Sequence, residues 1–124
     1  TFLPNYCMIA GFLIYLFSLI IITRAMLVNR HFEGTVRIQE DRNHRVIDRG
    51  PYRYIRHPGN LGMVLSVFAL PLIVGTAWAL IPAFLAALLT IVRTVKEDDF
   101  LKSSLEGYRE YATRVPFRVV PFVW

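Results

Sequence analysis

The sequence has a single cysteine, Cys7, and two long stretches that contain no charged side chain. One cysteine excludes an internal disulfide, so cross-links do not hold the fold. No Asp, Glu, Lys or Arg occurs in residues 1–23 or 57–92, and all 14 basic and 9 acidic residues lie in segments 24–56 and 93–118. A charged side chain at the centre of a membrane helix costs about 2.5–3.5 kcal/mol on insertion scales. This separation of charge from apolar sequence predicts an integral membrane protein.

Several motifs that would carry chemistry are missing. His31, His44 and His57 are spaced 13 residues apart and belong to no HExxH or CxxC pattern, so we expect no metal site. The sequence has no GxSxG elbow, no P-loop and no Rossmann glycine fingerprint. Aromatic side chains do not alternate with a basic stripe, so the net charge of +5 does not predict a nucleic-acid partner.

The apolar sequence is long enough to cross a bilayer more than once. At about 1.5 Å per residue, a helix through residues 2–23 reaches roughly 33 Å, enough for a hydrocarbon core of about 30 Å. The block 58–92 is too long for one span and is interrupted by Pro71, Gly75 and Pro82. It therefore predicts a hairpin of two helices, at about 60–74 and 77–93, that turns near Gly75.

The remaining sequence is polar. Apolar side chains recur at steps of three and four after residue 94, which predicts an amphipathic helix over 94–113. The prolines of the tail exclude a helix throughout 115–124. We expect an all-α single membrane domain with about three transmembrane helices and a cytoplasmic amphipathic C-terminal helix. Its parts are a transmembrane helix (2–27), a cytoplasmic connector (28–57), a transmembrane helical hairpin (58–93), and a cytoplasmic helix with tail (94–124).

The charged segments also predict how the protein lies in the membrane. Segment 24–56 has eight Arg against four acids, and segment 93–118 has six basic residues against five acids. The positive-inside rule places both segments in the cytoplasm, at the plasma or inner membrane of a bacterium or the endoplasmic reticulum of a eukaryote. An apolar or lipid-linked substrate would reach a site there sideways from the bilayer. The sequence leaves the oligomeric state open.

Two polar clusters lie where the charged segments meet the apolar ones. The first spans 50–62 and contains Arg56, His57 and Pro58 at a helix N-terminus, which favours a carboxylate or phosphate. The second spans 93–99, and its three successive acids suit a cationic ligand. The alternative is that Arg56 and His57 only anchor a helix at the interface, and that the acids form exposed ion pairs worth under about 1 kcal/mol each.

Taken in order, the clusters resemble a known family. Arg56-His57-Pro58-x-x-x-Gly62, a hydrophobic hairpin and Arg93-x-x-x-Glu97-Asp98 are similar to the isoprenylcysteine carboxyl methyltransferase and phospholipid methyltransferase superfamily of integral membrane enzymes. The resemblance covers roughly residues 31–124. It continues in His44-x-Val46-Ile47-x-x-Gly50-x-Tyr52, Gly107-Tyr108-x-x-Tyr111, and Val115-Pro116 followed by Pro121. Members usually have further spanning helices upstream, which implies that this chain corresponds to the C-terminal portion of a longer family pattern.

The resemblance implies methyl transfer from S-adenosylmethionine to a lipid-linked or apolar acceptor, with a carboxylate favoured, as in isoprenylcysteine carboxyl O-methylation. Arg93 would orient the acceptor carboxylate, and His57 would accept a proton from an amine acceptor, so these two are the expected catalytic residues. The family commonly has Tyr at the position of Asn60 and Glu at that of Asp98. The implied cofactor-binding residues are His44, Val46, Ile47, His57, Asn60, Glu97 and Asp98.

Two other functions stay open. Membrane sterol and steroid reductases share a His-Pro pair and a Val-Pro-aromatic-Arg tail like that of Val115 to Arg118, which would imply NADPH. The acids at 97–99 argue against NADPH because they would repel its phosphates. The third possibility is a non-enzymatic helical membrane protein that retains a decayed site.

Overall fold

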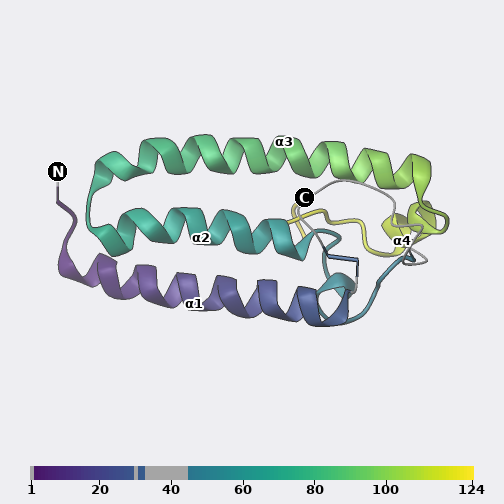
Figure 1. Cartoon of the computed structure of the whole chain (residues 1–124), viewed down its shortest axis with the longest axis horizontal. Coiled ribbons are helices and arrows are strands. Elements are labelled where there is room, and N and C mark those ends of the chain that lie inside the picture. Colours follow the sequence, from purple (N-terminus) through teal and green to yellow (C-terminus); the bar gives the residue numbers. More distant parts are fainter. Residues whose placement is uncertain (1, 30, 33–44) are drawn as a thin grey trace.

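The computed structural model describes residues 2–29, 31–32 and 45–124, and in these ranges the protein is built from helices (Figure 1). The three long helices lie side by side, with α2 in the middle, while α4 lies at one end and the C-terminal tail runs from it back to the start of α2 (Figure 1). The fold class predicted from the sequence is confirmed as all-α for the described part. The α-helices are α1 (Asn5–Val28), α2 (Pro58–Val74), α3 (Leu80–Ser104) and α4 (Tyr108–Arg114), and two short 3₁₀ helices are η2 (Gly50–Arg53) and η3 (Ala77–Ala79).

The turn between α2 and α3 forms where the sequence predicts it. Gly75 ends α2 with φ of +84°, a conformation that side chains with a Cβ rarely adopt, and its N–H donates to the carbonyl of Pro71 at 2.9 Å. The N-terminus of α1 reaches the same level, because the N–H of Leu3 donates to the carbonyl of Gly75 at 2.7 Å. The hairpin is therefore joined to the start of α1 at one end of the molecule, which we call the turn end.

Small residues hold α1 against α2. The buried residues of α1 are Gly11, Ser18 and Ala25, which recur every seven residues and so share one face. A Cβ at Gly11 would lie 2.8 Å from Cβ of Leu72, and a Cβ at Gly62 would lie 3.1 Å from the carbonyl oxygen of Ser18. Helix packing within membranes depends on such close approach, because lipid offers no hydrophobic drive for helices to associate.

The outward faces of the long helices are apolar. Large side chains such as Phe12, Phe17, Phe84 and Leu89 are more than half exposed. Among the described residues, two helices are long and apolar enough to cross a membrane, namely Asn5–Val28 and Ala77–Ser104, and α2 is a shorter apolar helix of 17 residues. Because most residues of the two long helices are exposed, they differ from the buried core helices of a soluble protein.

The third helix corrects one predicted boundary. The sequence predicts a helix ending at 93 and another over 94–113, whereas α3 runs without a break from Leu80 to Ser104. Residues 105–107 then interrupt the helix, with Gly107 at φ of +86°, and the separate helix α4 begins at Tyr108. The change from apolar to charged sequence at Arg93 ends the apolar part of α3 but not its backbone hydrogen bonding. The tail after Val115 consists of bends and turns, as its prolines predict.

Candidate functional site

A fully buried carboxylate lies at the centre of the end opposite the turn, which we call the polar end. Asp98, near the C-terminus of α3, is 0% exposed. Arg56 binds it with two parallel hydrogen bonds, Nε to Oδ1 at 2.9 Å and Nη2 to Oδ2 at 2.7 Å. This geometry is the strongest common form of ion pair in proteins. Four further groups contact the carboxylate, namely His57 Nε2 at 2.9 Å, the Tyr108 hydroxyl at 2.8 Å, Arg118 Nε at 3.2 Å and Lys102 Nζ at 3.3 Å.

These side chains come from four parts of the chain, namely the segment before α2, α3, α4 and the tail. His57 is the residue before α2, and Pro58 begins that helix because its missing N–H and fixed φ suit the first turn. The tail lies beside this segment, since the N–H groups of Arg56 and His57 donate to the carbonyls of Phe117 and Arg118 at 2.9 and 2.8 Å. Arg56 Nη1 also donates to the carbonyls of Ala112 and Val115 at 3.3 and 3.2 Å. We call Asp98 and its five partners the Asp98 cluster.

Three buried tyrosines at the polar end, Tyr52, Tyr108 and Tyr111, have raised pKa values. Burial, together with the adjacent charge of Asp98, raises the pKa of the Tyr108 hydroxyl, so this group donates a hydrogen bond to the carboxylate. Burial raises the pKa of Tyr52 to about 12, and it also raises the pKa of Tyr111, whose hydroxyl donates to the carbonyl of Tyr52 at 2.6 Å. The Tyr111 hydroxyl therefore joins α4 to η2 beside the Asp98 cluster.

A second polar group lies between α2 and α3, one helical turn from Asp98. Asn60 is buried, and its Nδ2 donates to the Thr94 hydroxyl at 3.0 Å and lies 3.5 Å from Glu97 Oε2. Arg93 Nε lies 4.0 Å from the same oxygen of Glu97. The side chains of Arg93 and Glu97 are 35% and 28% exposed, so both charges remain accessible, in contrast to that of Asp98. We call Asn60, Arg93, Thr94 and Glu97 the α2–α3 polar group.

The predicted site residues thus fall into two adjoining sets. The structure brings His57 together with Asp98, and Asn60 together with Arg93 and Glu97. Val46 packs against the buried cluster of Leu105, Tyr108, Tyr111 and Val115, and Ile47 is half-buried. His44 lies outside the described residues.

Four members of the Asp98 cluster, namely Arg56, Lys102, Tyr108 and Arg118, were not among the site residues that the sequence predicts. The pattern placed Arg56 in the 50–62 cluster, as part of a possible anion site or as an interface anchor, and it predicted no buried ion pair, whereas Arg56 and Asp98 are buried against each other. Tyr108 lies within the pattern on which the methyltransferase resemblance rests, whereas Arg118 belongs to the Val-Pro-aromatic-Arg tail that membrane reductases share. The spacing of residues along the chain gave no indication that they meet Asp98.

The charges of the two sets suit a zwitterionic ligand. Three permanent cations surround the single carboxylate of Asp98, so the cluster carries an excess of positive charge. The accessible acid and base of the α2–α3 polar group lie next to it. The carboxylate of Glu97 can bind an ammonium and the guanidinium of Arg93 can bind a carboxylate, so the pair can hold groups of opposite charge at the junction of α2 and α3.

The fold and the site define a class of helical membrane protein in which apolar helices carry a buried ionic cluster at one end. The sequence model of one family, described as phospholipid methyltransferase, matches residues 6–107, which is most of the chain. The chain belongs to this family, a member of the isoprenylcysteine and phospholipid methyltransferase membrane superfamily, as its motifs predict. Comparison with individual curated proteins gives no match.

Proposed function

We propose that the protein transfers a methyl group from S-adenosylmethionine to a lipid-linked or apolar acceptor at the polar end of its helices. The observation that carries this proposal is the pair of accessible opposite charges, Glu97 and Arg93, beside buried Asn60 in a protein of a methyltransferase family. S-adenosylmethionine supplies a methyl group bound to a positively charged sulfur. Methyl transfer needs alignment and favourable charge placement more than proton transfer, and a rigid ionic site provides both.

The chain's residues divide into ligand-binding and positioning groups in this proposal. Glu97 would bind the ammonium of the methyl donor, and Asn60, held by Thr94, would hydrogen-bond to its polar end. Asp98 and His57 are buried against each other, which supports a role in holding the N-terminus of α2 beside Glu97. Direct contact of either residue with the donor, and the covering role of His44, Val46 and Ile47, stay predictions.

Ligand binding to the detergent-purified protein tests the donor. Calorimetry should show micromolar binding of S-adenosylmethionine and S-adenosylhomocysteine. Glu97→Gln should weaken binding by about ten- to hundredfold, the loss of one hydrogen bond to a charged group. Asp99→Asn is the matched control, because it removes an exposed charge two positions along the same helix and should leave affinity unchanged. Equal affinity in wild type and Glu97→Gln, or tighter binding of NADPH, would overturn the proposal.

For the acceptor we propose a carboxylate oriented by Arg93, supported by the excess of positive charge at the polar end. The second candidate is the amine of a phospholipid, which the description of the family favours. Transfer of radioactive methyl from the donor to a prenylated cysteine or to phosphatidylethanolamine distinguishes them. Arg93→Gln should reduce methylation of the carboxylate and leave binding of the donor within about twofold, since Arg93 is assigned here to the acceptor.

We also propose that all three long helices span the membrane with the polar end in the cytoplasm. At about 1.5 Å per residue the 17 residues of α2 reach roughly 26 Å, slightly less than a hydrocarbon core of about 30 Å. The excess of Arg in segment 24–56 supports the cytoplasmic side. Labelling of single cysteines in intact cells tests this arrangement. The native Cys7 lies near the turn end, and Glu110→Cys in a Cys7→Ser background places a single exposed cysteine at the polar end. If a membrane-impermeant reagent added outside the cell labels Glu110→Cys, the polar end is not cytoplasmic and the proposed arrangement is wrong.

A further inference from the structure

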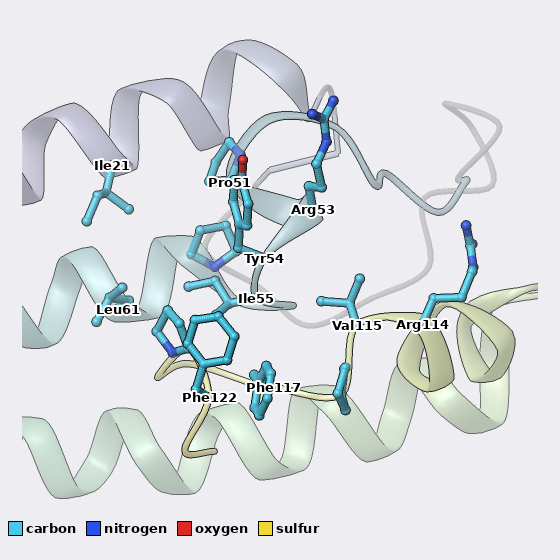
Figure 2. Close-up of a pocket in the computed structure, with 13 residues that line it drawn as sticks. Ile21, Pro51, Arg53, Tyr54, Ile55, Leu61, Arg114, Val115, Phe117 and Phe122 are labelled. Carbon is cyan, nitrogen blue, oxygen red and sulfur yellow. The ribbon is translucent and has the colours of Figure 1, made fainter.

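An apolar cavity of about 480 Å³ lies at the polar end between α1, the segment that precedes α2 together with the first turn of α2, and the tail. Its walls include Ile21 of α1, Leu61 of α2, Ile55, and Phe117 and Phe122 of the tail (Figure 2). The volume falls within the range of about 300–1,000 Å³ that is usual for small-molecule sites. Eleven of the 13 side chains that line it are uncharged and largely apolar, so the cavity suits a hydrocarbon chain.

The two charged residues that line the cavity, Arg53 and Arg114, are both cationic. In the view of Figure 2 both side chains point upward, Arg53 above the centre of the group and Arg114 at its right, whereas Ile21 and Leu61 lie at its left. Arg53 is exposed, and the described part of the chain contains no acid paired with it. Arg114 lies 3.4 Å from Asp48, but both side chains are about half exposed or more, and such pairs exchange partners readily.

The cavity is separate from the α2–α3 polar group. Ile55 and Pro58 form part of its wall, while the two residues between them, Arg56 and His57, turn their side chains to Asp98. No member of the α2–α3 polar group lines the cavity. A molecule in the cavity would therefore contact the opposite side of the 55–58 segment from the accessible charges of Arg93 and Glu97.

The orientation of the cavity matches that of a lipid in the bilayer. Its apolar end is formed by side chains of two apolar helices, and its cations belong to the polar segments that flank them. A lipid places its chains toward the hydrocarbon core and its phosphate at the interface, where Arg side chains bind phosphate in a planar, two-pronged geometry. We infer that the cavity binds one acyl chain of an anionic membrane lipid that is not the methyl acceptor, with the lipid phosphate held by Arg53 and Arg114.

Binding of this lipid would fasten the tail to the Asp98 cluster. Val115 and Phe117 line the cavity, and their backbone carbonyls accept hydrogen bonds from Arg56 at 3.2 and 2.9 Å. A chain packed against Phe117 would keep these carbonyls in place. Since a ligand that binds only the folded form stabilises it, the melting temperature should rise with the concentration of anionic lipid.

Native mass spectrometry of the detergent-purified protein tests the site with dioleoyl phosphatidylglycerol and dioleoyl phosphatidylcholine, which differ only in their headgroups. We expect one phosphatidylglycerol molecule bound about tenfold more tightly than phosphatidylcholine. Replacing Arg53 and Arg114 together by Gln should reduce this preference below about twofold, whereas Arg109→Gln, which removes an exposed cation of α4 outside the cavity, should preserve it. Equal binding of the two lipids, or an equal loss in Arg109→Gln, would overturn the inference.

A second measurement needs no substitution in the protein. A phosphatidylglycerol with a photoreactive diazirine in its acyl chain should cross-link to Leu61, Ile55 or Phe122 of the wild-type protein. Cross-links confined to the outward faces of α1 and α3 would contradict the site. Tighter binding of dioleoyl phosphatidylethanolamine than of phosphatidylglycerol would also contradict it, because the headgroup amine would then decide affinity. None of these measurements uses the methyl donor, so their outcome is independent of the proposed activity.

Discussion

Replacing Asp98 by Asn removes one charge from the most enclosed part of the protein. Arg56 is 5% exposed and would keep its hydrogen bonds to two backbone carbonyls but lose its counter-ion. Donors surround both carboxylate oxygens, so the NH₂ group of Asn faces a donor in either orientation of the amide. Breaking a buried ion pair from one side costs about 3–5 kcal/mol, a large part of the roughly 5–15 kcal/mol that stabilises a typical protein.

Thermal unfolding in detergent, followed by circular dichroism, measures this loss. Asp98→Asn should lower the melting temperature by roughly 10 °C or more. Asp99→Asn, which makes the same chemical change at the next, exposed position, should shift it by less than about 2 °C. In a double-mutant cycle, Arg56→Gln and Asp98→Asn should couple by about 2 kcal/mol or more. A melting temperature for Asp98→Asn equal to that of Asp99→Asn would refute the reasoning that the buried carboxylate holds the polar end together.

Three further predictions concern stability. Burial raises the pKa of Tyr52 from 10 to about 12, so the unfolded chain loses the phenol proton at a lower pH than the folded protein does. The melting temperature should therefore fall between pH 10 and pH 12. In Tyr52→Phe this decrease in melting temperature should be smaller. Gly11→Val should destabilise the protein by about 1–3 kcal/mol because its Cβ would meet α2, whereas Ala10→Val on the exposed face should not, as compared by thermal unfolding. Tyr108→Phe should cost about 1.5–3 kcal/mol through the lost hydrogen bond to Asp98, and a change below about 0.5 kcal/mol in denaturant titration would contradict that role.

The helical framework was predictable because its signals are local. A long charge-free run within a membrane must satisfy its own backbone hydrogen bonds, which a helix does. A glycine between two apolar runs, next to residues that interrupt a helix, indicates a turn. These signals located α1 and the turn at Gly75 to within a few residues. The end of α3 was not predictable in the same way, because a charged helix surface follows naturally from an apolar one once the helix leaves the bilayer. Gly107, with positive φ, marks the real break more closely than the first charged residue, Arg93.

Apart from the i, i+4 pair of Asp98 and Lys102, the contacts of the Asp98 cluster could not be derived from local patterns. The pattern identified His57 and Asp98 by resemblance, but their 2.9 Å contact joins residues 41 positions apart. Arg118 comes from the tail, for which the sequence predicted only the absence of a helix. Which charged residues become buried depends on how the tail lies against α2, a tertiary arrangement that periodicity does not encode. The spacing of Arg93 and Glu97 did predict their proximity, because both lie on one helix.

The Asp98 cluster also implies an order of assembly. Its carboxylate receives hydrogen bonds from Arg56 and Tyr108 and from Arg118 of the tail, so these groups meet only after α3 is made. Each long helix satisfies its own backbone hydrogen bonds as it is synthesised, whereas the buried ions need partners that emerge later. Until then Arg56 lacks the carboxylate and the carbonyls that bind it in the folded protein. The polar end of the protein would therefore close last, when residues 117 and 118 leave the ribosome and reach the start of α2.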